Sequence, residues 1–169
     1  MRATISAIIA ALVSCVALVT ACVTSSETLP LPGHIKVNMT SPASNVPAEI
    51  AAFSGKWVGQ WTSTFAGNLY VEKISADGAT EGVYAWEDKP NWNIRGGAVR
   101  FRGQISGRAL RFASGRTSFE FQMLSDGRLE GFRYAGGDTG YSITMTKVEQ
   151  AKQPATTNPL YDSRWFEND

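Results

Sequence analysis

The 169-residue sequence predicts an all-β protein built around a single small, eight-stranded antiparallel up-and-down barrel. Eight short segments rich in aromatic and β-branched residues follow one another along the chain. Apolar and polar residues alternate within them, and glycine-containing turn dipeptides separate them. Long leucine-rich amphipathic runs, which would indicate helices, are missing. Together these observations favour a meander of strands over a helical or mixed fold.

The expected strands share period-two alternation and end at turn residues; they cover 56–64, 68–75, 80–86, 98–105, 109–113, 117–124, 128–134 and 141–148. Phe119 and Phe121, for example, alternate with Ser118 and Glu120, which gives one dry and one wet face. Such a sheet can close on itself. A seven- or eight-stranded sandwich is the alternative. The simple strand order favours the barrel, because sandwiches usually need longer Greek-key connections.

Tight turns join these strands. Asp77-Gly78 and Asp126-Gly127 are hairpin dipeptides, in which glycine adopts the positive φ that the turn requires. The barrel domain is expected at 53–148, followed by a polar tail at 149–169. That tail contains the apolar cluster "PLYDSRWF", which either docks on the barrel or acts as a free peptide motif.

The first 21 residues have the pattern of an export signal. Arg2 precedes an apolar stretch at 5–18, which is too short to span a bilayer comfortably. Val19-Thr20-Ala21-Cys22 then resembles a bacterial lipobox. This resemblance implies cleavage before Cys22 and attachment of lipid, such as palmitate, to that residue. The alternatives are an ordinary secretory signal with an incidental cysteine and a retained membrane helix.

A lipobox implies a location and a membrane partner. The protein would be lipid-anchored in the bacterial cell envelope. Val23, rather than aspartate, follows the cysteine, which by enteric-type sorting indicates the outer membrane facing the periplasm. Cys15 lies in the apolar stretch and would be removed with it. The mature domain would therefore fold without a disulfide.

Residues 22–52 are rich in Ser, Thr, Pro and Asn and are expected to form a flexible tether after the lipidated cysteine. His34, the only histidine, falls within it. With neither a second histidine nor a free thiol in the mature chain, no zinc ligand set is recognisable and no cofactor is expected.

The start of the domain, "FSGKWVGQW", carries a Gly-x-Trp motif at Gly55-Lys56-Trp57 and repeats it at Gly59-Gln60-Trp61. This motif before an antiparallel meander resembles the calycin barrels, which include lipocalins, avidins and fatty-acid-binding proteins. The resemblance implies that Trp57 and Trp61 close the barrel floor and that Lys147 packs across them through a cation–π contact. The whole chain also looks like small secreted proteins of proteobacteria, a likeness that implies no activity.

One long loop, within "YAWEDKPNWN", gathers the candidate ligand-binding residues Tyr84, Trp86, Glu87, Asp88, Asn91 and Trp92. Aromatic rings beside carboxylates and amides at a barrel mouth are typical of a site for a small amphipathic or apolar ligand. The alternative is that the two tryptophans only shield the barrel rim from water.

Three arginines, Arg100, Arg102 and Arg111, are expected on one outward face. Such a basic face could bind an anionic envelope component such as lipopolysaccharide phosphate, or it could simply be solvated. The formal net charge of +1 gives no indication of a nucleic-acid partner.

Catalytic patterns are weak. Glu87 and Asp88 are neighbours, so in a strand they point to opposite faces and cannot flank one glycosidic bond. A nucleophilic triad lacks its histidine, because His34 lies in the tether. We expect a non-catalytic binding module rather than an enzyme. The alternative is an envelope interaction or inhibitor protein that acts through rim loops or the arginine-rich face, without an internal ligand.

Overall fold

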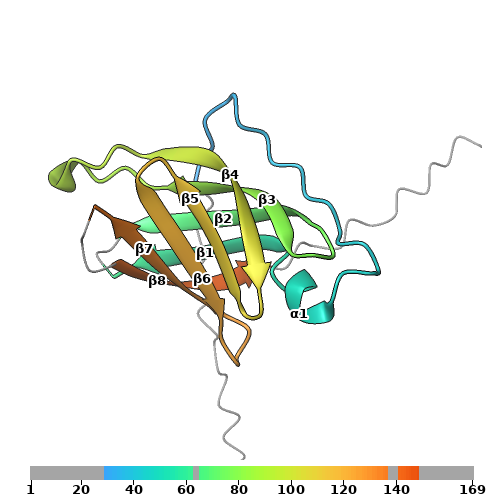
Figure 1. The fold of residues 1–169 in the computed structure, drawn as a ribbon. Coiled ribbons are helices and arrows are strands. Elements are labelled where there is room, and N and C mark those ends of the chain that lie inside the picture. The colour runs from blue at the N-terminus through green and yellow to red at the C-terminus, as the bar shows by residue number, and fades with distance from the viewer. Residues whose placement is uncertain (1–28, 63–64, 137–140, 149–169) are drawn as a thin grey trace, which may run out of the picture.

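The computed structural model describes residues 29–62, 65–136 and 141–148, and it confirms the predicted barrel. Eight antiparallel strands pair in chain order, and pairing of β1 with β8 closes the sheet (Figure 1). The strands are β1 Gly55–Trp61, β2 Ala66–Ile74, β3 Ala79–Trp86, β4 Gly97–Ser106, β5 Ala109–Ser114, β6 Thr117–Met123, β7 Leu129–Ala135 and β8 Tyr141–Val148.

The strand boundaries lie close to those expected from alternation and turn residues. β1 ends at Trp61, before the predicted end of the first strand, whose last two positions lie outside the described residues. Gly78 and Gly127 have φ of 85° and 82°, as the hairpin dipeptides require. These glycines thus fit the hairpin turns that join β2 to β3 and β6 to β7.

Phenylalanine rings fill much of the barrel interior. The ring centroids of Phe101 and Phe112 lie 3.9 Å apart, and those of Phe112 and Phe119 lie 4.9 Å apart, in stacked arrangements. Room for such rings comes from glycines on the inner face. A Cβ on Gly82 would lie 2.6 Å from Phe101, and one on Gly131 would lie 2.5 Å from Phe121. The interior is therefore a packed core and not a continuous channel.

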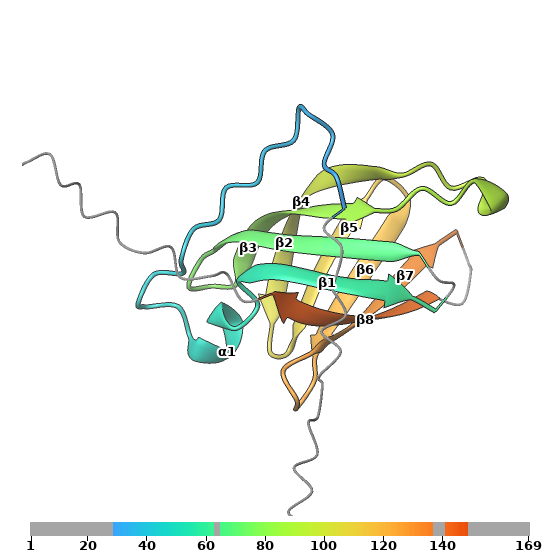
Figure 2. The ribbon, with the colours of Figure 1, turned by 180° about the vertical axis from the view of Figure 1, so that it is seen from behind.

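Trp57 closes one end of the barrel. It is 1% exposed, and its indole N–H donates to the Phe53 carbonyl oxygen at 2.9 Å. Lys147 Nζ lies 5.3 Å from the centroid of the Trp57 ring and donates to the Ala52 carbonyl oxygen at 2.9 Å. Partial burial of the ammonium lowers the pKa of Lys147. The short helix α1 (Ala48–Ala51) lies at this end, which we call the floor (Figure 2).

The described part of the expected tether lies against the barrel. Residues 29–46, which we call the strap, run across the outer side of the sheet before α1 (Figure 2). The amides of Asn38 and Thr40 donate to the side chain and the carbonyl oxygen of Glu72 on β2, at 2.5 and 3.0 Å. Within the segment 22–52, for which the sequence predicts a tether, these two backbone donors of the strap bind a strand of the barrel.

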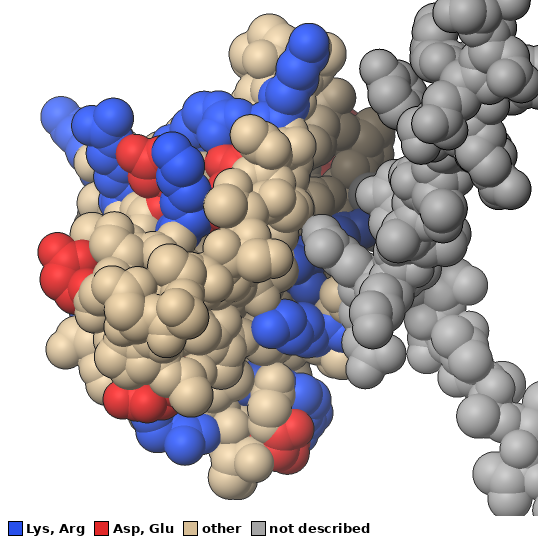
Figure 3. Space-filling model, turned by 90° about the vertical axis from the view of Figure 1, so that its right-hand side faces the viewer, with Lys and Arg blue, Asp and Glu red and all other residues tan. Residues whose placement is uncertain are grey.

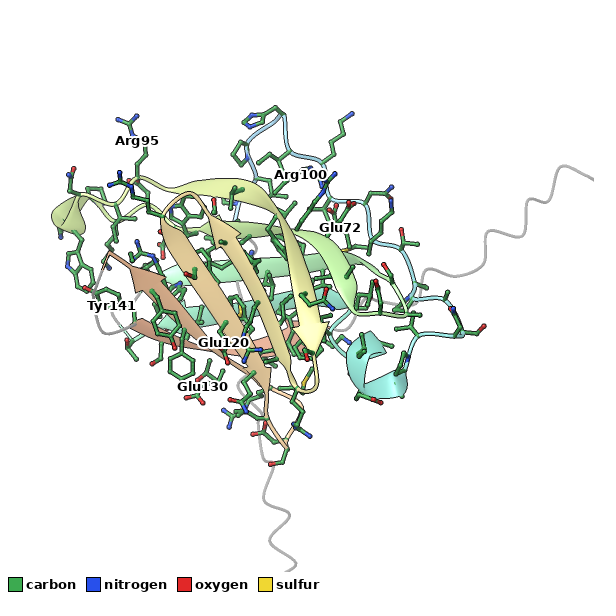
Figure 4. All side chains as sticks on the ribbon, in the orientation of Figure 1. Glu72, Arg95, Arg100, Glu120, Glu130 and Tyr141 are labelled. Atoms are coloured by element: carbon green, nitrogen blue, oxygen red, sulfur yellow. The ribbon has the colours of Figure 1, made fainter. Side chains whose placement is uncertain are left out.

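Arg100 completes this attachment. It donates to Glu72 Oε2 at 2.7 Å and to the Lys36 carbonyl oxygen, so it joins the barrel to the strap (Figure 4). The Glu72 side chain is only 5% exposed in this ion pair. A carboxylate this deeply buried needs its donors, since a buried charge without partners is strongly unfavourable.

Replacing Arg100 with Met should lower the free energy of unfolding by about 2 kcal/mol, because Glu72 loses a charged donor while it stays buried. Arg102→Met is the matched control. Arg102 pairs with Glu81 at 3.4 Å, but their side chains are 89% and 48% exposed. That change should cost below about 0.5 kcal/mol. Urea denaturation measures both, and amide exchange at Asn38 and Thr40 should quicken only in the first variant. Equal losses in the two variants would contradict this account of the strap.

Candidate functional site

A cavity of about 250 Å³ opens into the barrel at the end opposite the floor. We call it the mouth pocket. Aromatic side chains dominate its lining, which comprises Trp61, Phe65, Tyr84, Trp86, Ile94, Val99, Ser114, Thr117, Phe119 and Arg133. These residues come from six strands and two loops, so the pocket depends on closure of the whole barrel.

A buried hydrogen bond anchors the base of the mouth pocket. The Trp61 indole N–H donates to the Tyr84 hydroxyl oxygen at 2.8 Å, and each residue is 2% exposed. Gly67 makes space for this contact, since a Cβ there would lie 3.0 Å from the Tyr84 hydroxyl and 3.1 Å from Trp61 Nε1. Burial raises the pKa of Tyr84 above its ordinary value, outweighing the opposing effects of the Trp61 hydrogen bond and the Arg133 charge. The phenol therefore stays protonated.

The walls present fixed ring faces. Tyr84 packs 4.9 Å from Phe119 and stacks 6.0 Å from Trp86, measured between ring centroids. Trp61 stacks on Phe65 at 6.0 Å. The Trp86 indole N–H donates to the Arg95 carbonyl oxygen at 2.8 Å, which fixes the ring at the rim. An apolar ring entering the pocket would meet flat surfaces that are already in place.

The long loop between β3 and β4 forms a narrow ribbon beyond the rim. Lys89 and Ile94 pair as an isolated bridge, with the short 3-10 helix η1 (Pro90–Trp92) at the tip. This ribbon projects from the mouth end of the barrel, where Figure 4 labels Arg95. Asn93 closes the turn with φ of 54°, a conformation that asparagine tolerates. The ribbon places Ile94 in the pocket lining and leaves its tip exposed.

The structure separates the six predicted ligand-binding residues into three groups. Tyr84 and Trp86 line the mouth pocket. Glu87 and Asp88 instead border a groove outside the barrel, which residues 29–32 of the strap also line. Their carboxylates accept the backbone amides of Ala66 and Gly96, both at 2.8 Å, so they hold the loop. Asn91 and Trp92 are exposed at the ribbon tip, where Trp92 is 48% exposed.

The predicted floor residues also separate. Trp57 contacts Lys147, as the calycin resemblance implies, but Trp61 lies in the mouth pocket at the other end. Trp57 and Trp61 share one face of β1 because they are an even number of residues apart, and both are buried, so that face is the inner one. Their positions along the strand place one in the floor and the other in the mouth.

The predicted basic face is largely neutralised by neighbouring strands. Arg100 pairs with Glu72, Arg102 with Glu81 and Arg111 with Glu120, at 2.7, 3.4 and 2.9 Å. In the strand register, Arg102 lies directly opposite Glu81. Arg111 likewise lies directly opposite Glu120. Figure 3, viewed from the floor side, accordingly shows acidic groups among the basic ones. The three arginines share the outer surface but do not form a purely positive patch.

Several lining residues were not among the predicted site residues. The most informative is Arg133 on β7, which lies two and four residues after the buried Gly131 and Leu129 and so shares their inward face. The signal was present in the sequence as a charged residue on an otherwise apolar face. Ser114, Thr117 and Phe119 carry no comparable signal, because their role depends on where the cavity opens.

No protein-family model matches the chain, and no curated protein matches it either. Within residues 29–62, 65–136 and 141–148, no helix is long and apolar enough to cross a membrane. The same residues contain no cluster of three or more His, Cys, Asp or Glu side chains suited to a metal ion. The fold and the pocket together define a small up-and-down β-barrel with a packed interior and an aromatic mouth.

Proposed function

We propose that the protein is a non-catalytic binding module of the bacterial cell envelope that takes one small amphipathic or apolar ligand into the mouth pocket. The observation that carries this proposal is the cavity of about 250 Å³, walled by aromatic rings, at the end of an otherwise filled barrel. Ligand pockets commonly measure roughly 300–1,000 Å³, so this one suits a compact ligand of one or two rings.

The pocket is also preorganised. The Trp61–Tyr84 hydrogen bond and the bond from Trp86 to the Arg95 carbonyl fix three of the rings before any ligand arrives. Binding then requires little ordering of side chains, which preserves affinity for a small molecule. Such a site combines apolar faces with a few polar groups at its edge, as small-molecule pockets usually do.

The lining supports binding rather than catalysis. Among the described residues that form the pocket there is neither a carboxylate nor a histidine that could act as a general base. Glu87 and Asp88, the nearest acidic residues in sequence, are bound to backbone amides outside it.

A second candidate function is an envelope interaction or inhibitor protein that acts through the rim. One observation favours it: the ribbon carries Trp92, 48% exposed, beyond the barrel mouth. Tryptophan is frequent among residues that dominate binding at protein interfaces. The arginine face gives less support, because neighbouring carboxylates pair with its guanidinium groups.

The envelope location rests on the lipobox resemblance at Val19-Thr20-Ala21-Cys22. Lipid on Cys22 would hold the protein at a membrane, in our proposal the outer membrane on its periplasmic side. Attachment of the strap at Lys36 leaves about 14 residues between that point and Cys22, and such a length spans at most about 50 Å. The barrel would then lie within that distance of the lipid surface.

A neutral two-ring probe tests the pocket. We expect 2-naphthamide to bind and to shift the backbone amide NMR signals of Thr117 and Phe119, and not those near Trp57. Thr117→Trp should fill the mouth and weaken binding by about tenfold or more. Ser118→Trp is the matched control, because Ser118 is exposed on the outer face of the same strand. Shifts centred on Trp92 or the outer face, or equal effects of the two variants, would contradict a ligand site in the mouth.

The anchor has its own test. Replacing Cys22 with Ser removes the sulfur that would carry lipid, so the full-length protein made in a Gram-negative host should move from the membrane to the soluble fraction. Mass spectrometry of the unaltered protein should show the added acyl chains. A Ser variant that stays on membranes after high-salt washing would contradict the anchor.

A further inference from the structure

Among the described residues that line the mouth pocket, Arg133 is the one with a positive charge. It lies on β7 opposite Phe119 on β6 and Tyr141 on β8, near the barrel rim, where Figure 4 labels Tyr141. Its side chain is half-buried. Arg133 thus contributes to the wall of the cavity, and its cross-strand neighbours are two aromatic residues.

The arginines on the outer surface differ from Arg133. Arg100, Arg102, Arg111 and Arg128 each have a carboxylate oxygen within 3.4 Å. For Arg133, the described part of the chain provides neither a carboxylate within salt-bridge distance nor a hydrogen-bond acceptor. A guanidinium has five N–H donors, so this half-buried side chain keeps donors available to an acceptor that enters the pocket.

A second donor points to the same cavity. The Tyr84 hydroxyl accepts from Trp61, and its own hydrogen meets no acceptor among the described residues. The positive charge of Arg133 lowers the pKa of the Tyr84 phenol, against the larger effect of burial, which raises it. Ser114 and Thr117 add hydroxyl groups to the lining. The pocket therefore offers donors and one positive charge without a described acidic side chain to balance them.

We infer that the mouth pocket selects a small aromatic carboxylate, whose ring lies against Trp61, Trp86 and Phe119 and whose carboxylate binds Arg133. The planar guanidinium suits a carboxylate because it can donate two parallel hydrogen bonds. A single arginine balances the single charge of a carboxylate, whereas a doubly charged phosphate monoester would keep one charge unmatched beside the aromatic walls. This inference rests on the proposed function, since it names the ligand class of the same pocket.

The test compares two ligands that share a ring system, 2-naphthoate and 2-naphthamide, by calorimetry at neutral pH. Wild-type protein should bind the carboxylate about tenfold tighter or more, because only the carboxylate carries a negative charge and can accept two parallel hydrogen bonds from the guanidinium. Arg133→Gln should abolish that preference and leave the amide's affinity within about twofold. Arg133→Lys keeps the charge without the planar fork and should retain part of the preference.

Arg116→Gln is the matched control. Arg116 lies exposed in the turn between β5 and β6, close to Thr117, and its loss changes the net charge equally. It should leave the preference for 2-naphthoate intact. A wild-type protein that binds both compounds equally would overturn the inference while leaving the proposed function in place. Loss of preference in the Arg116 variant to the same degree would also overturn it, since diffuse charge would then suffice.

The binding data distinguish the proposed ligand site in the mouth from the role assigned to Arg133. If neither compound binds in the mouth, judged by the amide signals of Thr117 and Phe119, the proposed function itself is contradicted. If both bind there with equal affinity, only the role assigned to Arg133 is lost. Retained binding of 2-naphthamide also shows that the Arg133 variants keep a folded pocket.

Discussion

The packing of phenylalanine rings across the barrel interior determines where a ligand could enter. Phe112 stacks on Phe101 and on Phe119, and these contacts occupy the centre between the floor and the mouth. The rings fit because Gly82 and Gly131 carry no side chain at the positions that face them. The mouth pocket lies where the strands extend past this stack, and there Trp61 and Tyr84 form its base. The mouth is therefore shallow and preformed.

The strap has a separate role, which is to join the barrel to whatever lies N-terminal to it. Glu72 is central to this attachment because it accepts from the strap amide of Asn38 and from Arg100, while its own carbonyl accepts from Thr40. In the lipid-anchored protein that we propose, the barrel would stay near the membrane surface instead of moving freely on a long tether. The mouth pocket lies at the other end of the barrel from Trp57, and residues 29–32 of the strap line the outer groove beside Glu87 and Asp88.

Much of the barrel could be predicted from the sequence, because alternation and turn dipeptides are local signals. The strands around Phe119 and Phe121 and the turns at Gly78 and Gly127 are examples. Alternation gives the face of a residue but not its height in the barrel, so Trp57 and Trp61 looked equivalent. The ion pairs of the outer arginines depend on which strands are neighbours and on their register, which the sequence does not state locally.

The candidate site was less predictable for a related reason. Composition predicts that its loop residues bind a ligand, yet the carboxylates of Glu87 and Asp88 accept from backbone amides that only the folded chain brings near. Arg133 is recognisable as inward-facing because it lies four residues after Leu129 on one strand and therefore shares its face. Whether that position borders a cavity or a packed core depends on the volumes of all the surrounding rings, and sequence patterns do not supply these.

Xenon binding tests most directly the claim that the barrel is filled at its centre and open at one end, because xenon enters apolar cavities without needing a polar partner. In crystals held under xenon pressure, we expect a bound atom among Trp61, Tyr84 and Phe119, and none between Trp57 and Phe121. Xenon in the centre of the barrel, or none at the mouth, would contradict this account.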